Sequence, residues 1–404
     1  MHYAVPRILA RSGQLEQLFT DFYLPRSLEK WKPHTKLFPK LLSRALGRHC
    51  EGLNGARVHS NPLLAVSYAA RIRITRHNGE CSPAYLWAGI NFQRWVAKRL
   101  NSSGWPEAIY AYNTAARDLF QQAANRGTYR ILEQTIAPLG MEREIVATTA
   151  ALFPEWSLSD SKTSTAQRHL EEREREEWAL ADRIICGSEF VASALRKQGV
   201  PGYKIHVVAY GYTMNDRFNF TPPPATHDGP LRILCAGTVG LRKGTPSLIA
   251  AAKKLGTKVD VTLAGSWDAP TSLIADLPAN VHWLGSVPRA RMTSLYEQSD
   301  VFVLPTLCEG SATVCYEACA HGLPIVTTLN SGFPIDEGVN GLIVPLNEPE
   351  SLAWTLELLN GDRLLLQTLA ANIYSRRGNF SFVAYEQRLL NALLPDKEQQ
   401  TPSP

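Results

Sequence analysis

The sequence predicts an α/β protein, because apolar runs alternate with loops and helical segments. The run at residues 300–305 leads into a polar loop, a helical segment and a second apolar run at 323–326. A shorter example begins at 232–236, where a glycine-punctuated turn precedes a helix expected over 246–255. Strand, loop, helix and strand in this order are typical of parallel sheets covered by helices. The 404 residues, 45% of them hydrophobic, suffice for two domains of ordinary size.

Two glutamates, Glu309 and Glu317, are separated by seven residues and lie between the apolar runs at 300–305 and 323–326. We expect Gly310 and Ser311 to open the helix, so that free backbone N–H groups favour an anion such as a diphosphate in the loop. Carboxylates suit hydroxyl groups, because each hydroxyl donates a charge-assisted hydrogen bond to them. A nucleotide-sugar carries both a diphosphate and hydroxyl groups.

Two cations, Arg242 and Lys243, follow the strand expected at 232–236. At the carboxyl end of a parallel strand, beside a helix start, such a pair is a candidate diphosphate clamp. Exposed basic pairs are common, so the clamp depends on the nearby glutamates. A glutamate near a helix start can also simply complement the helix dipole, which suits Glu309 better than Glu317. Glu317 would lie in mid-helix among apolar residues, where a carboxylate needs a partner.

The C-terminal half resembles the donor domain of the retaining family 4 glycosyltransferases, also called group 1. The resemblance covers about residues 180 to 390, and its ordered set of motifs is specific although each piece alone is weak. The matching segments are 236–244, 284–285, 295–296, 299–300, 309–317, 322–326 and 341–345. The resemblance implies a GT-B fold, in which two doubly wound, Rossmann-like α/β domains face a cleft.

The resemblance also implies an activity. The protein is expected to be a hexosyltransferase that moves a hexose-type sugar, with retention and without a metal ion, from a UDP- or GDP-linked donor to a glycan, lipid-linked or other acceptor. Polysaccharide or glycoconjugate biosynthesis is the expected setting, and the donor substrate is the only small molecule required. The absence of any Asp-x-Asp fits, because metal-dependent sugar transferases commonly use that pair.

Roles follow for the site residues. Arg242 and Lys243 would stabilise the departing diphosphate, at about 3 kcal/mol for each well-placed donor, while Glu309 would hold sugar hydroxyls and Glu317 the ribose. Many family members carry arginine where this chain has Thr238, so Arg242 is expected to supply that cationic contact. The remaining donor-binding candidates are Thr238, Gly240, Gly310 and Ser311.

We expect the first domain, over residues 1–218, to bind the acceptor. Relatives open this domain with a strand and a glycine-rich loop, whereas this chain starts at 1–6 as if in the helix that follows, and the first strand is expected to be missing. Either the start has been clipped or the protein works without that loop. The alternative function is therefore an N-terminally incomplete or non-catalytic GT-B protein that binds a nucleotide-sugar or a partner. Asn113, where relatives often place a cleft histidine, and Glu133 are the acceptor-side candidates.

Local patterns place the elements of this first domain. The segment at 165–181 predicts a helix with side-chain ion pairs whose charges are mostly solvated. Ser188 is expected to cap the helix that follows it. Strands are expected at 15–23, 108–112, 129–133, 183–187 and 205–209.

Composition marks the domain boundary. The proline-rich stretch 219–230 predicts a linker, followed by the nucleotide-sugar-binding domain over 231–379. A helix at about 380–394 is expected to cross back onto the first domain, and 396–404 is expected to be a frayed tail.

The basic charge is concentrated at one end: residues 1–100 carry a net charge of +11 and the remainder −6. Between 26 and 48, lysines and arginines alternate with apolar residues. This segment either makes peripheral contact with an anionic membrane or forms a solvated helix face with a core stripe. Nucleic acid is not expected as a partner, because no binding motif accompanies the charge.

Several classes of protein are disfavoured. There is no apolar stretch of membrane-spanning length, no signal-peptide core and no zinc-like cluster. Seven cysteines without paired C-x-x-C spacing predict reduced thiols and a cytoplasmic location, with peripheral binding at the inner membrane face as an extension. The turn at 237–244 lacks the G-x-G-x-x-G spacing of a dinucleotide-dependent oxidoreductase.

Overall fold

The computed structural model describes residues 3–24, 50–53, 55–77, 80–158, 164–213 and 229–393. The chain divides into two compact units, Met1–Glu133 with Thr163–Arg183, and Gln134–Lys162 with Ile184–Pro404. The domain boundaries expected from the sequence stay a prediction. The basic segment 26–48, most of the linker and the tail 396–404 lie outside the described residues.

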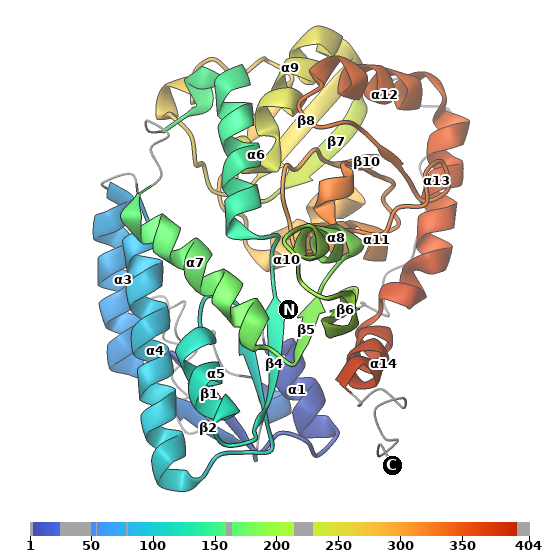
Figure 1. Cartoon of the computed structure of the whole chain (residues 1–404). Coiled ribbons are helices and arrows are strands. Elements are labelled where there is room, and N and C mark those ends of the chain that lie inside the picture. The colour runs from blue at the N-terminus through green and yellow to red at the C-terminus, as the bar shows by residue number, and fades with distance from the viewer. Residues whose placement is uncertain are drawn as a thin grey trace. The chain divides into compact units, whose positions relative to one another are not determined.

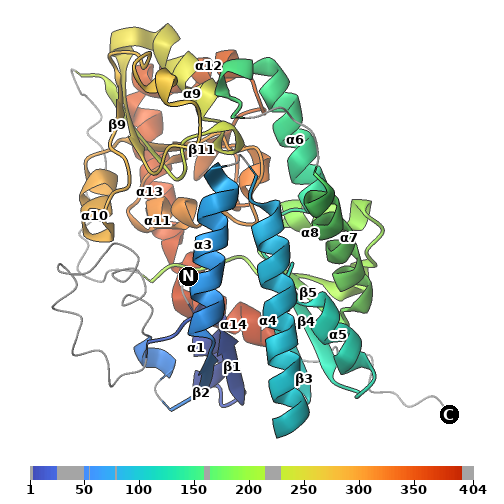
Figure 2. The ribbon, with the colours of Figure 1, turned by 90° about the vertical axis from the view of Figure 1, so that its left-hand side faces the viewer.

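The first unit contains two pairs of parallel strands, β1 with β2 and β3 with β4. Its longest helix, α4, runs side by side with α3 (Figure 1; Figure 2). The helices and strands of this unit are α1 (Ala4–Arg11), β1 (Gln17–Thr20), β2 (Arg57–Ser60), α3 (Pro62–His77), α4 (Ser82–Ser103), β3 (Ala108–Tyr112), α5 (Arg117–Ala124), β4 (Tyr129–Gln134) and α7 (Thr165–Leu180).

Helix α7 corrects one expectation. Its position agrees with the predicted helix, but its charges are not mostly solvated, because Glu171, Glu174 and Glu177 are all buried. The spacing of three residues between them places these glutamates on one face of the helix. Composition alone does not predict this arrangement, because acidic residues are rarely buried unless they are paired.

The second unit is built around a six-stranded sheet with strand order β12-β11-β10-β7-β8-β9. Every recorded pairing in this sheet is parallel. The sheet strands are β7 (Leu231–Ala236), β8 (Val259–Ala264), β9 (Val281–Trp283), β10 (Val301–Leu304), β11 (Ile325–Thr327) and β12 (Gly341–Ile343). The chain moves outward from β7 to β9 and then returns to place β10 on the other side of β7. The order of strands therefore reverses between β7 and β10, which makes this a topological switch point.

The core of the second unit surrounds this sheet. All four residues of β10 are buried, as expected of a parallel strand that helices cover on both faces. Helices α9, α11, α12 and α13 contribute buried residues to the same core, and α9 and α12 lie next to each other in both views (Figure 1; Figure 2). The helices of this part of the chain, with α10 included, are α9 (Thr245–Leu255), α10 (Arg289–Glu297), α11 (Thr313–Ala320), α12 (Pro349–Gly361) and α13 (Arg363–Arg376).

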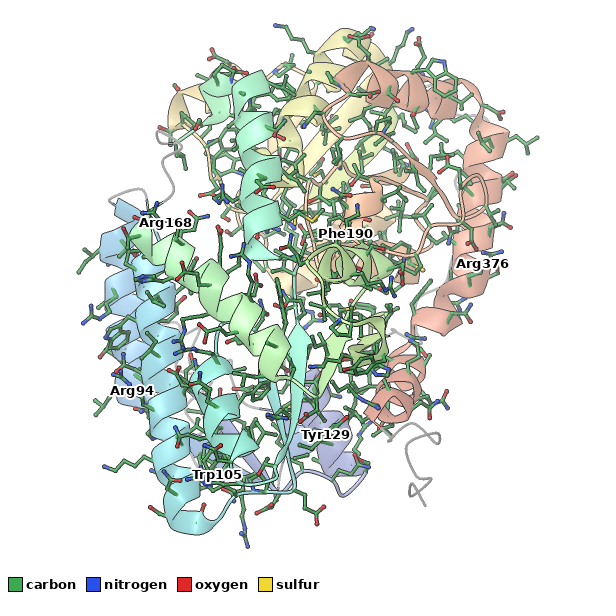
Figure 3. The ribbon with its side chains drawn as sticks, in the orientation of Figure 1. Arg94, Trp105, Tyr129, Arg168, Phe190 and Arg376 are labelled. Carbon is green, nitrogen blue, oxygen red and sulfur yellow. The ribbon has the colours of Figure 1, made fainter. Side chains whose placement is uncertain are left out.

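The rest of the second unit comes from chain segments on both sides of the first unit's last helix. Ser188 caps α8, as predicted, and accepts a hydrogen bond of 3.3 Å from the N–H of Val191. Phe190 of α8, labelled in Figure 3, packs against a buried cluster of Ala137, Leu307 and Cys308. The elements are α6 (Leu139–Leu152), β5 (Arg183–Cys186), α8 (Glu189–Lys197), β6 (Ile205–Val207) and α14 (Phe382–Leu393).

Candidate functional site

The loops that follow β7 and β10 meet at the carboxyl edge of the sheet. The N–H of Leu307 and the hydroxyl of Thr306 both donate to the carbonyl of Arg242, at 2.9 and 3.0 Å. Gly244, with φ of 66°, allows this approach, because a Cβ there would lie 1.8 Å from the carbonyl oxygen of Pro305. The two predicted motifs are thus held together by backbone contacts at the switch point, where ligands of open α/β sheets bind.

The three predicted catalytic residues form one cluster. Arg242 donates to Oε1 of Glu309 at 3.0 Å, and Nζ of Lys243 contacts the same oxygen. The hydroxyl oxygen of Thr306 lies 3.2 Å from the same carboxylate oxygen. The side chains of Arg242, Lys243 and Glu309 are 34%, 13% and 13% exposed. Charge-assisted bonds in such a partly buried setting fix the carboxylate and both cations in one arrangement.

A second carboxylate, which sequence reasoning missed, adjoins this cluster. Oε1 of Glu142, on α6, lies 3.6 Å from Nε of Arg242. Burial raises the pKa of Glu142, an effect that Arg242 and Lys243 oppose and the charge of Glu309 reinforces. Glu142 lies 100 positions before Arg242, and no local pattern connects them.

Glu317 lines a separate pocket, and its carboxylate has the hydrogen-bond partner that its position in mid-helix requires. Tyr296 of α10 donates to its carboxylate at 3.0 Å. The ring of His321 stacks on Tyr296 with centroids 4.9 Å apart, and its Nδ1 lies 2.8 Å from the carbonyl oxygen of Glu317. Burial raises the pKa of Tyr296, and the charge of Glu317 raises it further.

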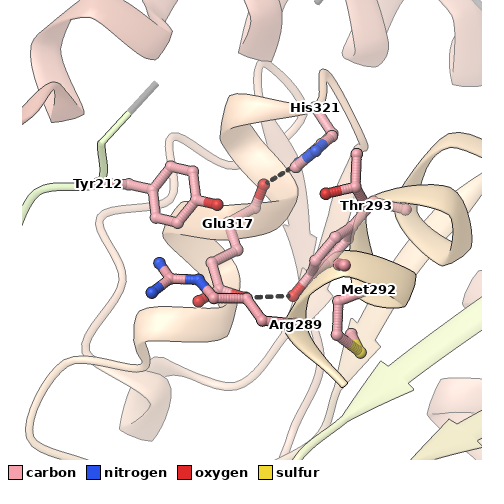
Figure 4. Close-up of a pocket in the computed structure, with 8 residues that line it drawn as sticks. Tyr212, Arg289, Met292, Thr293, Glu317 and His321 are labelled. Carbon is pink, nitrogen blue, oxygen red and sulfur yellow. Dashed lines mark hydrogen bonds between the residues drawn. The ribbon is translucent and has the colours of Figure 1, made fainter. Parts of the chain in front are cut away.

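Figure 4 shows this pocket, which has a volume of about 340 Å³. Arg289 and Tyr212 stand beside Glu317, so the pocket offers a cation, a carboxylate and an aromatic ring. Tyr296 belongs to a motif on which the family resemblance rests, whereas Arg289 has no sequence signal of its own. The residues that line the pocket are Tyr212, Arg289, Ala290, Met292, Thr293, Tyr296, Glu317 and His321.

Gly310 and Ser311 do not open the helix, contrary to expectation, because α11 begins at Thr313. Gly310 lies against the backbone of Thr135, whose carbonyl oxygen would be 1.8 Å from an added Cβ. Ser311 is buried, and its hydroxyl lies 2.6 Å from that of Tyr316. The backbone N–H groups of Gly310 and Ser311 donate to no protein atom in the part of the chain that the structure describes.

The other two donor-side candidates lie in the turn after β7. Gly240 donates its N–H to Oγ1 of Thr245 at 3.1 Å, and an added Cβ would lie 2.8 Å from the carbonyl oxygen of Asp268. Thr238 is nearer to solvent, with its hydroxyl 3.3 Å from that of Ser266. Gly240 therefore has a packing role, while Thr238 is accessible.

The acceptor-side candidates lie together in the first unit, at the ends of paired strands. The N–H of Asn113 donates to the carbonyl of Glu133 at 3.0 Å. Tyr110 donates to the carboxylate of Glu133 at 2.9 Å, and the amide of Asn113 lies 3.4 Å from Glu174. Both candidates are buried, so hydrogen bonds fix their positions at this edge.

Glu177 of α7 anchors the loop that follows Asn113. Its carboxylate accepts from the N–H groups of Thr114, Ala116 and Arg117, at 2.7, 2.9 and 3.1 Å. Thr114 has a φ of 70°, unusual for a residue other than glycine, so the loop conformation needs this support. Burial raises the pKa of Glu177 to about 7, although the three N–H groups oppose that rise.

Two kinds of feature, a metal-binding cluster and a membrane-spanning helix, are absent from the described residues. Among them, no group of three His, Cys, Asp or Glu side chains is placed to hold a metal ion. Within the same ranges, every helix is too short or too polar to cross a bilayer.

Comparison with known proteins shows what this part of the chain is similar to. Residues 230–362 match the family model described as "Glycosyl transferases group 1". The match lies in the region where the motifs predicted this family, so this part of the chain is similar to the group 1 glycosyltransferases.

Two relatives show how far the similarity extends. The amylovoran biosynthesis glycosyltransferase AmsK of Erwinia amylovora is 29% identical over 208 residues, which are 46% of this chain and 51% of AmsK. The D-inositol 3-phosphate glycosyltransferase of Xylanimonas cellulosilytica is 29% identical over 203 residues, 44% of this chain and 47% of the relative. The match with each relative thus spans about half of that relative's length.

A solved structure extends the comparison to most of the chain. The Anabaena protein Alr3699/HepE in complex with UDP has a TM-score of 0.58 at 17% identity, covering 94% of this chain and 99% of that protein. At this identity the likeness establishes the fold alone. The predicted fold class, an α/β chain with two parallel-sheet domains that matches GT-B glycosyltransferase structures, is confirmed.

Replacing Gly310 by alanine is expected to lower the free energy of unfolding by about 1–3 kcal/mol, because the new Cβ collides with the backbone of Thr135. Urea unfolding monitored by circular dichroism measures the loss. Gly361→Ala is the matched control, since nothing lies within 4 Å of a Cβ at that position. Equal stability of the two variants would show that the backbone of Thr135 does not approach Gly310 closely.

The buried carboxyl of Glu177 predicts a pH-dependent stability. Because burial raises its pKa from the ordinary value of 4.5 to about 7, the folded state binds the proton more tightly, so its contribution is greatest below pH 4.5 and is lost as the pH rises towards 7. The loss is on the order of 3 kcal/mol. The free energy of unfolding of the wild type, relative to Glu177→Gln, should fall through this window. Exposed Glu172→Gln is the control, and parallel profiles for Glu177→Gln and wild type would contradict the assignment.

Proposed function

We propose that this protein is a retaining glycosyltransferase that requires no metal ion. It moves a hexose-type sugar from a UDP- or GDP-linked donor to a glycan, lipid-linked or other acceptor, in the assembly of a polysaccharide or glycoconjugate. The observation that carries the proposal is the cluster at the switch point, where Glu309 lies between Arg242 and Lys243.

The cluster suits a diphosphate leaving group. As the sugar departs, negative charge grows on the diphosphate, and preorganised cations stabilise that charge without a reorganisation cost. Arg242 and Lys243 are preorganised by Glu309, and the N–H groups of Gly310 and Ser311 add donors on the same loop.

The two glutamates take separate roles. Glu309, among the cations, is assigned to the hydroxyl groups of the sugar. Glu317, in its own pocket with Tyr296 and Arg289, is assigned to the ribose of the nucleotide. Because Glu317 already accepts one hydrogen bond, it has the capacity to accept further bonds from vicinal hydroxyls.

The acceptor is assigned to the first domain, over residues 1–218, with Asn113 and Glu133 on the acceptor side. Their hydrogen bonds hold both side chains in fixed positions, which favours recognition of a defined hydroxyl. The donor domain is assigned to 231–379. A cytoplasmic location stays a prediction from the cysteine pattern.

The names of related proteins support the class of substrate. AmsK is named for amylovoran biosynthesis, and the structures of HepE contain UDP or UDP-glucose. Both agree with a nucleotide-sugar donor and a glycan product. Thr238, where many members have arginine, is the observation that favours the alternative of a binding protein without turnover.

The first test is a calorimetric screen against UDP, GDP, ADP and their common sugar conjugates, with a chelator and then with magnesium. We expect one nucleotide family to bind equally well under both conditions. Binding that depends on magnesium would contradict the metal-independent mechanism. Binding of a donor that is never hydrolysed or transferred would favour the non-catalytic alternative.

Two substitutions should separate binding from chemistry. Glu317→Gln is expected to weaken nucleotide binding by about 1–3 kcal/mol through loss of a charged hydrogen bond, measured by calorimetry. Lys243→Ala should slow transfer about a hundredfold or more, measured under saturating donor. Exposed Glu297→Gln and Lys254→Ala are the controls for charge alone. Wild-type behaviour of both site variants would remove these residues from the donor site.

A further inference from the structure

Helix α3 of the first unit has an apolar stripe on its outer surface. Leu63, Val66 and Ile74 are 81%, 68% and 62% exposed, and exposed Ala70 lies between them. Their spacing of three, four and four residues aligns all four side chains along one face of the helix. Large exposed apolar side chains that are contiguous, rather than scattered, mark an interaction surface.

The opposite side of α3 packs against other residues of the first unit. Leu64 is buried, and the ring of Tyr68 lies 6.5 Å from that of Tyr85 on α4. Figure 2 shows α3 and α4 side by side along their lengths. The helix is therefore apolar on two sides, of which only one packs against α4. Packing within this helix pair accounts for Leu64 and Tyr68 and leaves the outer stripe unexplained.

The charge around the stripe has one sign. Helices α3 and α4 together contain no Asp or Glu, and they carry six basic residues: Arg71, Arg73, Arg76, Arg94, Lys98 and Arg99. Arg71 and Arg73 are exposed next to Ile74, and Arg71 also lies 4.3 Å above the ring of Trp87. Arg94, labelled in Figure 3, adds an exposed charge on α4.

We propose that the outer face of α3 docks on the surface of an anionic membrane, with the apolar stripe at the boundary of headgroups and acyl chains. The arginines beside the stripe would contact lipid phosphates. Apolar side chains flanked by arginines can enter the headgroup region while the arginines remain beside the lipid phosphates. Anionic lipids attract such basic residues within a Debye length.

Charge complementarity favours an anionic membrane over two other candidates for covering the stripe, a second copy of the chain and the chain's own segment 26–48. A second copy of the chain would bring two basic faces together, which like-charge repulsion disfavours. The chain's own segment 26–48 is basic as well, so repulsion acts against its covering the stripe. An anionic lipid surface supplies both the apolar medium and the opposite charge.

The docking surface is independent of the donor site, because it lies in the first unit and shares no residue with the cluster or the pocket. It goes beyond the proposed function by assigning a binding surface to a different face of the first unit. Nucleotide binding measured without vesicles therefore tests the proposed function separately.

The experiment is flotation of the full-length protein with vesicles of phosphatidylcholine alone or mixed with phosphatidylglycerol. We expect binding to the mixed vesicles only, weakened by added salt. The variant Leu63→Ser/Val66→Ser/Ile74→Ser should lower the partition coefficient at least about tenfold. Arg71→Gln/Arg73→Gln should weaken binding and reduce its salt dependence.

Matched controls keep the result interpretable. Trp354→Ser/Leu364→Ser/Val383→Ser removes side chains that are 66%, 65% and 61% exposed in the second unit, and should bind as the wild type does. A further variant neutralises the basic residues of 26–48 and leaves the stripe intact. Circular dichroism and thermal melting establish that each variant is folded.

Four outcomes would overturn the proposal. They are no flotation of the wild type, equal flotation with neutral vesicles, wild-type flotation of the folded stripe variant, and loss of flotation only when segment 26–48 is neutralised. A wild-type dimer in analytical ultracentrifugation that the stripe substitutions abolish would instead assign this face to a second copy.

Discussion

The arrangement of the second unit depends on the contact between the loops after β7 and β10. Because strand order reverses between these two strands, their carboxyl ends open onto the same edge, and the backbone bonds to Arg242 fix one loop on the other. Gly244 makes that approach sterically allowed. The ion pairs of Glu309 then follow from the fold, since its carboxylate has both cations within reach. Without the loop contact, three charged side chains would be separate surface residues of little energetic consequence.

The first unit uses carboxylates in a different way. Three glutamates on one face of α7 are buried, and Glu177 satisfies three backbone donors that otherwise have no helical acceptor. A single carboxylate thus sets the conformation of the loop from 114 to 117, next to Asn113. Burial of the charge is costly, as its raised pKa shows, and the hydrogen bonds offset that cost.

The sequence predicted the strands at 108–112 and 129–133, the cap at Ser188 and the family, because each depends on neighbours in the chain or on an ordered set of motifs. It placed the start of α11 two to three residues too early, since Gly310 serves a close backbone approach to Thr135 that no local pattern reveals. It also missed Glu142, which meets Arg242 only through tertiary folding. The charges of α7 were misjudged for the same reason, since the partners of Glu174 and Glu177 lie about 60 positions away in the sequence.

The central claim is that a nucleoside diphosphate binds with its phosphates at Arg242 and Lys243. The most direct measurement is a pair of calorimetric titrations, of the diphosphate that binds best and of its parent nucleoside, on the wild type and on Lys243→Ala. The account predicts that the diphosphate binds the wild type more tightly than the nucleoside does, that the substitution removes most of this difference, and that nucleoside affinity is unchanged. An undiminished preference for the diphosphate in the variant would place the phosphates elsewhere and contradict the account.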